Sequence, residues 1–191
     1  MDPYLQTKAA IKNCYGIDVG GWVQAGMTAN FEDPNDRYNG PLLLNDRVGD
    51  LQMHQLWLYA QKPVDTGGYG VDIGGRFDMF YGTDWRAAYF HGFGMEDRLN
   101  GSNQLYGLSL AQMYAEVAVN DLSVKLGRMT GILGYEIAPP MGNFFYSRSY
   151  ALCYGEPILI TGLMSNYKAS DQLTLLGGFH QGIHQFDNEN G

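Results

Sequence analysis

Residues 71–81 read Val-Asp-Ile-Gly-Gly-Arg-Phe-Asp-Met-Phe-Tyr, and they form the clearest alternating stretch in the chain. One phase is apolar, with Val71, Ile73, Phe77, Met79 and Tyr81. The other phase carries the charges, with Asp72, Gly74, Arg76, Asp78 and Phe80. Successive side chains of a β-strand point to opposite faces, so this stretch predicts a strand with one apolar and one charged face. In a soluble sandwich the apolar face would be the core, whereas in a membrane barrel it would face lipid.

The same alternation recurs elsewhere and predicts about seven strands in all. The other expected strands cover approximately residues 21–28, 55–61, 112–119, 122–127, 160–168 and 173–180. A strand of about ten residues is long enough for a tilted crossing of the hydrocarbon layer of a membrane. No segment has the period of an amphipathic helix, so the sequence predicts an all-β protein.

The connections between these strands alternate between long and short. Residues 30–50, 83–110 and 131–157 are long, whereas residues 62–70 are shorter and residues 120–121 and 169–171 are tight. Transmembrane barrels have this asymmetry, with short periplasmic turns and long external loops. A Greek-key sandwich would not sort its loops in this way. The sequence therefore predicts an antiparallel up-and-down transmembrane barrel with a periplasmic N-terminus.

The composition supports strands rather than helices as the membrane-crossing elements. Gly (26 residues) and Tyr (14 residues) are abundant among the 191 residues, and only 17% are charged. A membrane-spanning helix needs about 20 consecutive apolar residues, and no such run occurs. The net charge of -8 and the scattered 12 Lys and Arg residues exclude a nucleic-acid-binding protein.

Neither the cysteines nor the histidines form a recognisable metal site. Cys14 and Cys153 are too far apart in sequence for a zinc motif, and they form either one disulfide or two free thiols. His180 and His184 would lie about 13 Å apart on a strand, too far to share a metal. No G-x-S-x-G motif occurs either. We expect no metal, no cofactor and no enzymatic activity.

Several short motifs resemble one family of membrane proteins. They include Gly-Trp-Val-Gln-Ala-Gly at 21–26, Gly-Gly-Arg-Phe-Asp at 74–78, Leu-Gly-Arg at 126–128, Asn-Phe-Phe-Tyr-Ser at 143–147 and Tyr-Gly-Glu-Pro at 154–157. In this order and spacing they resemble the putative β-barrel porins of bacterial outer membranes, from about residue 17 to the end. The resemblance implies an outer-membrane pore built from a longer chain.

The resemblance also shapes our expectations about the extent of the chain. Single-chain bacterial barrels have an even number of strands, from about 8 upward, so about seven strands would be the N-terminal part of a larger barrel. We expect residues 1–191 to form a single domain, with a lead-in segment at 1–16. The start of the chain lacks the basic and apolar regions of a signal peptide. Its expected partners are the outer-membrane bilayer and small polar solutes or ions, and assembly as a homo-oligomer is left open.

The charges on the polar phase are the candidates for lining a pore, since charged walls set selectivity. The candidates are Asp72, Arg76, Asp78, Glu116 and Lys125. An alternative is that Arg76 pairs with a neighbouring carboxylate only to satisfy the inner wall.

The segment at 131–157 is too apolar to extend freely into solvent as an external loop. We expect it to fold inward and narrow the pore, with Glu136, Arg148 and Glu156 near the constriction. The alternative is that its aromatic side chains pack on the barrel rim.

Arg128 breaks the alternation, because it falls on the lipid-facing phase that Leu122, Val124 and Leu126 define. A bare arginine near the membrane midplane would cost about 2–4 kcal/mol. Either a β-bulge after Gly127 turns Arg128 away from lipid, or Arg128 already lies at the membrane interface; we favour the bulge, which glycine permits.

Together these features predict an outer-membrane channel for passive diffusion of ions and small polar solutes. One alternative is a structural or adhesive barrel whose lumen is plugged by its long loops. Another is a soluble β-sandwich lectin that would use Trp57 and Tyr59 to bind sugar. A barrel hydrolase would need an outward-facing Ser, His and acid constellation, which the sequence does not reveal.

Overall fold

Seven antiparallel strands form one sheet in the computed structural model, which describes residues 12, 14–32, 34–89, 98–101 and 104–183. Each strand pairs with its neighbours in sequence, in the order β1-β2-β3-β4-β5-β6-β7. The strands are β1 (Asp18–Gly26), β2 (Gln52–Lys62), β3 (Val71–Gly82), β4 (Gly107–Val119), β5 (Leu122–Thr130), β6 (Leu159–Lys168) and β7 (Thr174–Ile183). Within this part of the chain β1 and β7 are free edges, so the sheet is open. The predicted all-β, up-and-down antiparallel fold is confirmed, as an incomplete barrel.

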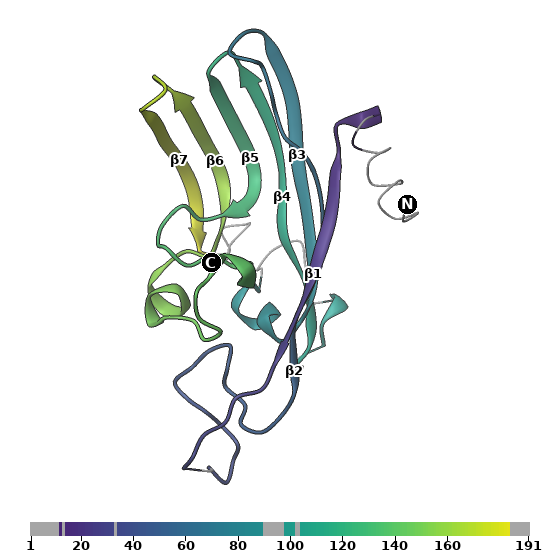
Figure 1. Ribbon diagram of the computed structural model, residues 1–191, viewed down its shortest axis with the longest axis vertical. Coiled ribbons are helices and arrows are strands. Elements are labelled where there is room, and N and C mark those ends of the chain that lie inside the picture. The colour runs from purple at the N-terminus through teal and green to yellow at the C-terminus, as the bar shows by residue number, and fades with distance from the viewer. Residues whose placement is uncertain (1–11, 13, 33, 90–97, 102–103, 184–191) are drawn as a thin grey trace, which may run out of the picture.

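The long and short connections lie at opposite ends of the sheet. The short turns after β2, β4 and β6 stand at the top of Figure 1, and the long connections after β1, β3 and β5 stand at the bottom. In the described residues of the long connections, the named helical pieces are short: η1 (Thr83–Ala87), η2 (Pro140–Gly142) and η3 (Ala151–Gly155). In the described residues, no helix has both the length and the apolar character needed to cross a membrane.

The short turns are bonded to one another. Asn120, in the turn between β4 and β5, has a φ of 54°, a left-handed conformation that Asn adopts more readily than most residues. Its backbone amide donates to the Gly70 carbonyl, and its side-chain oxygen accepts from the Gly70 amide (2.9 and 3.0 Å). The carbonyl of Asp121 accepts from the backbone amide of Lys168 in the next turn (3.0 Å). The three short turns therefore form one connected rim.

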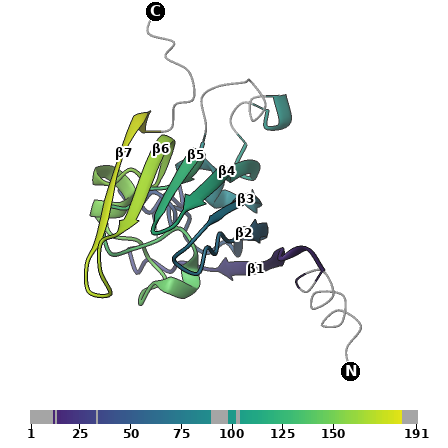
Figure 2. The same cartoon turned by 90° about the horizontal axis from the view of Figure 1, so that it is seen from above.

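The buried core lies on one face of the sheet. Seen from above, the strands stand in a row in sequence order, and most of the connecting segments gather on one side of that row (Figure 2). The core cluster combines strand residues with residues of η1 and the segment beside it: Trp57, Phe80, Trp85, Ala88, Ala111 and Leu159. We call this the inner face of the sheet.

The cysteines are free thiols, with Cys14 exposed and Cys153 half-buried, so the disulfide alternative is wrong. In the part of the chain that the structure describes, no three His, Cys, Asp or Glu side chains are placed to hold a metal ion. His184 and most of the lead-in segment lie outside the described residues.

Candidate functional site

The two faces of the sheet differ in chemistry. On β3 the side chains of Val71, Ile73 and Phe77 are exposed, whereas Asp78 on the opposite phase is completely buried. The neighbouring strands continue the exposed apolar face with Val23, Leu56, Leu58, Met113, Val117, Leu122 and Leu126. A soluble protein rarely leaves so continuous an apolar surface uncovered, so this outer face is suited to contact with lipid.

Asp78 organises the polar side chains of the inner face. Its carboxylate accepts two hydrogen bonds from Arg76, from Nε at 2.6 Å and from Nη2 at 2.8 Å. It also accepts from Trp57 Nε1 at 2.9 Å and Gln112 Nε2 at 3.1 Å. Since Trp57 is on β2 and Gln112 on β4, one buried carboxylate ties three adjacent strands together.

An aromatic stack crosses the inner face beside this carboxylate. Trp22, Trp57 and Phe80 occupy one row of the ladder, on β1, β2 and β3. The ring centroids of each successive pair are 4.7 Å apart, and the planes of Trp57 and Phe80 are parallel within 1°. Trp57 and Phe80 are almost fully buried, so they form wall structure and offer no surface to a solute.

The connection between β5 and β6 lies against this inner face. The Ala138 carbonyl accepts from Gln55 Nε2 on β2 (3.1 Å), and the Leu152 side chain is buried. Locally, the side chain of Asn143 closes the turn, because it bonds to the backbone of Ile137 and Pro139. We call residues 131–158 the inner segment.

A chain of three polar side chains, two of them buried (His54 and Asp84), anchors the inner segment to the wall. His54 Nδ1 lies 3.0 Å from Asp84 Oδ1, and His54 Nε2 lies 2.6 Å from the Tyr146 hydroxyl. A carboxylate only accepts, so Nδ1 carries the proton and Nε2 accepts from Tyr146. Gln55 Nε2 donates to the second Asp84 oxygen at 2.8 Å. Burial raises the pKa of Tyr146, which keeps its hydroxyl protonated as a donor.

The first long connection, residues 27–51, is held to η1 by an ion pair. Arg86 donates from Nη1 and Nη2 to the two Asp46 oxygens at 2.7 and 2.9 Å. Burial alone would raise the pKa of Asp46, but the hydrogen bonds and charge of Arg86 outweigh it and hold this pKa below its ordinary value. The same contact raises the pKa of Arg86.

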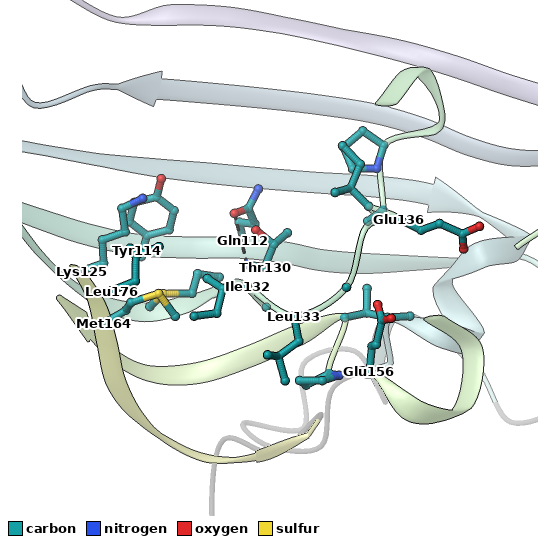
Figure 3. A pocket seen from close by; sticks show the side chains of 18 of the residues that line it. Gln112, Tyr114, Lys125, Thr130, Ile132, Leu133, Glu136, Glu156, Met164 and Leu176 are labelled. Atoms are coloured by element: carbon teal, nitrogen blue, oxygen red, sulfur yellow. Dashed lines mark hydrogen bonds between the residues drawn. The ribbon is translucent and has the colours of Figure 1, made fainter. Parts of the chain in front are cut away.

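A cavity of about 480 Å³ remains between the wall and the inner segment. Strands β3, β4 and β5 contribute Arg76, Tyr114 and Lys125 to its lining, and the inner segment contributes Glu136 and Glu156. Figure 3 shows Lys125 beside Tyr114 at one end, the two glutamates at the other, and Gln112 and Thr130 between them. The cavity therefore carries charged groups at both ends.

One comparison with known proteins identifies the family. The family described as putative beta-barrel porin-2, OmpL-like, matches residues 16–191, which is nearly the whole chain. The chain belongs to this family. No curated protein matches the sequence, and no solved structure matches it either. The resemblance inferred from the sequence motifs is confirmed, and the seven-stranded open sheet agrees with a porin barrel that is incomplete.

The charged residues predicted to line the pore all belong to the polar phase of the strands, but their positions and bonding partners differ. Arg76 and Lys125 line the cavity. Asp78 is paired with Arg76, as the alternative interpretation of Arg76 expected. Glu116 lines a second cavity, of about 510 Å³, at the end where the short turns lie. Asp72 is near the same end, where its carboxylate bonds to Lys62 Nζ at 2.9 Å.

The three constriction candidates are separated by the path of the inner segment. Glu136 and Glu156 line the cavity, whereas Arg148 is buried behind it and donates to the Ala138 carbonyl at 3.1 Å. Burial lowers the pKa of Arg148. Several aromatic side chains of the segment, including Phe144 and Phe145, are exposed, so within the described residues they do not pack on the sheet.

The bulge predicted after Gly127 is wrong. Arg128 pairs in register with Met113 on β4 and with Thr161 on β6, without a shift on either side. Arg128 is nevertheless only 2% exposed, and its Nη2 donates to the Ala88 carbonyl at 2.7 Å. Gly127 has a φ of 133°, and a Cβ there would collide with the Met113 carbonyl oxygen. The strand is therefore reoriented at a glycine without an inserted residue.

Sequence reasoning missed His54, Asp84 and Tyr146. They come from β2, η1 and the inner segment, and only the fold of two long connections brings them together. The available signal was weak, since His54 and Gln55 are adjacent polar residues at the start of a strand that also carries the inward aromatic side chains Trp57 and Tyr59.

Proposed function

We propose that this protein is an outer-membrane channel through which ions and small polar solutes diffuse passively. The observation that carries the proposal is the contrast between the two faces of the sheet. Apolar side chains cover the outer face, whereas the inner face carries a paired carboxylate, tyrosines, amides and charges around a cavity with charged groups at both ends. Membrane channels built from strands have this arrangement, with lipid outside and water inside.

The membership of a porin family supports the same function. The inner segment reduces the cross-section beside the wall, and the charges that remain at the cavity surface would set ion preference there. In this proposal Lys125 faces the permeating ions, and Glu136 and Glu156 face them from the inner segment. No step of the proposal needs a cofactor or a chemical reaction.

Single-channel recording tests the proposal, with the full-length protein in a planar lipid bilayer under a salt gradient. We expect discrete conductance steps. A Lys125→Glu variant should shift the reversal potential toward cation preference, because the charge at the cavity wall changes by two units. The matched control is Arg37→Glu, since Arg37 is an exposed residue of the first long connection and is paired with Asp50.

An inserted, folded protein that gives no conductance would contradict the channel and favour the plugged structural barrel. Equal shifts in reversal potential for Lys125→Glu and Arg37→Glu would show that the cavity wall does not control ion passage.

A further inference from the structure

The cavity beside the inner segment has opposite charges at its two ends. In Figure 3, Lys125 lies at one end with Tyr114, and Glu136 and Glu156 lie at the other. The uncharged Gln112 and Thr130 lie between them. A solute that carries a negative and a positive group some distance apart would match both ends at once.

The charge at the basic end is available to a solute. Arg76 also lines the cavity, but it is ion-paired with Asp78. Lys125 Nζ stands 5.0 Å from the centre of the Tyr114 ring, and no ion pair of Lys125 occurs among the described residues. Glu116 lies opposite Lys125 in the strand register, but it lines the separate cavity near the short turns.

The acidic end is also incompletely satisfied. One Glu136 oxygen accepts from the backbone amide and hydroxyl of Ser149, at 2.9 and 3.0 Å. Glu156 Oε2 is buried and receives no hydrogen bond from the described residues. Two carboxylates with acceptor capacity to spare favour a donor-rich cation such as an ammonium group.

The distance between the two ends selects the length of the solute. Lys125 and Thr130 are five residues apart on β5, which corresponds to about 16 Å of strand. The glutamates lie on the segment that follows Thr130, beyond that end of the strand. An extended peptide advances about 3.3–3.6 Å per residue, so a peptide of about four to five residues extends over about 13–18 Å and spans this distance. The two charges of a free amino acid are too close together to reach both ends.

The remaining walls suit a peptide with small apolar side chains. Ile132, Leu133, Met164 and Leu176 line the cavity, together with the amide side chains of Gln61 and Asn166. Amides both donate and accept hydrogen bonds, so they match a peptide backbone. The volume of about 480 Å³ lies within the range of small-ligand sites.

We propose that this cavity binds short zwitterionic peptides of about four to five residues during their passage through the channel. The peptide carboxylate lies at Lys125, and the terminal ammonium lies at Glu136 and Glu156. The proposal rests on the proposed channel function and adds a substrate class to it.

The experiment measures block of the ionic current by tetraalanine, with the full-length protein in a planar bilayer. The comparison compounds are N-acetyl-tetraalanine amide, which has the same backbone without terminal charges, and free alanine. We expect tetraalanine to block at concentrations about tenfold or more below those of either comparison compound. We expect Lys125→Met and Glu156→Gln each to weaken the block about three- to tenfold, as the loss of one charged hydrogen bond would. Arg37→Met, on the exposed connection, should leave the block unchanged.

The outcomes separate the peptide site from the channel itself. Absence of conductance in every condition would overturn the channel function. Normal conductance with equal block by tetraalanine and its blocked analogue would overturn the peptide site alone. Block by free alanine as strong as that by tetraalanine would also overturn it, because the two charged ends would then not be bridged.

Discussion

Replacing Asp78 with alanine should destabilise the barrel strongly, by about 3–5 kcal/mol of unfolding free energy. Asp78 is completely buried and accepts four hydrogen bonds, two of them from Arg76. Removing one partner of a buried ion pair costs about 3–5 kcal/mol, because the other charge is left uncompensated. The freed Trp57 N–H adds a cost of about 1–3 kcal/mol. The Arg76 side chain is 21% exposed, so water can solvate part of its uncompensated charge. The expected total loss of unfolding free energy therefore stays at about 3–5 kcal/mol.

The assay is urea-induced unfolding of the full-length protein from lipid vesicles, followed by tryptophan fluorescence. The matched control is Asp50→Ala, since Asp50 pairs with Arg37 on an exposed connection and its removal should cost at most about 1 kcal/mol. If Asp78→Ala lost no more stability than Asp50→Ala, the three-strand network would not stabilise the barrel and our reasoning would be refuted.

Two further predictions concern the outer face and the first long connection. Leu126→Arg, on the exposed apolar phase of β5, should cost about 2–4 kcal/mol in vesicle unfolding, while Ser123→Arg on the opposite phase should cost clearly less; equal losses would contradict the lipid-facing assignment. The pKa of Asp46 lies below its ordinary value of 3.8, so the stability from its pair with Arg86 is complete above that value and is lost as the pH falls through the lower, folded-state pKa. Urea midpoints measured from about pH 6 to about pH 2 should therefore fall more steeply for wild type than for Asp46→Asn, and parallel curves would refute this.

The strands could be predicted from the sequence because their side-chain period depends on local geometry alone. The alternation at 71–81 places Phe80 on the same phase as Asp78, and both are on the inner face. Loop lengths could be predicted equally well, since they follow from where the strands end. Arg128 shows the limit of predicting faces from strict alternation, because the unusual backbone at Gly127 reorients the strand without changing the register.

The candidate site was harder to predict from the sequence than the strands were, because it depends on the paths of the long connections. The apolar character of the inner segment indicated that it would not extend into solvent, and it does lie against the inner face. Nothing local distinguished Glu136 and Glu156, which line the cavity, from Arg148, which is buried behind it. The assignment of these residues to a constriction stays a prediction until conductance is measured.

The Tyr146–His54–Asp84 contact imposes an order on assembly. Tyr146 is 92 positions from His54, whereas Asp84 is 30 positions from it, so the β2–β3 region can form its His54–Asp84 contact well before the inner segment arrives. The inner segment follows β5 in the chain but is anchored on β2, two strands away from β4 and beyond β3. It can therefore dock only after β4 and β5 have been added to the sheet. Contacts so distant in sequence form late, because closing a long loop costs conformational entropy before the contacts between its ends can stabilise the protein. Until then the inner face beside these strands stays uncovered, so docking of the inner segment is a late step in the assembly of this sheet.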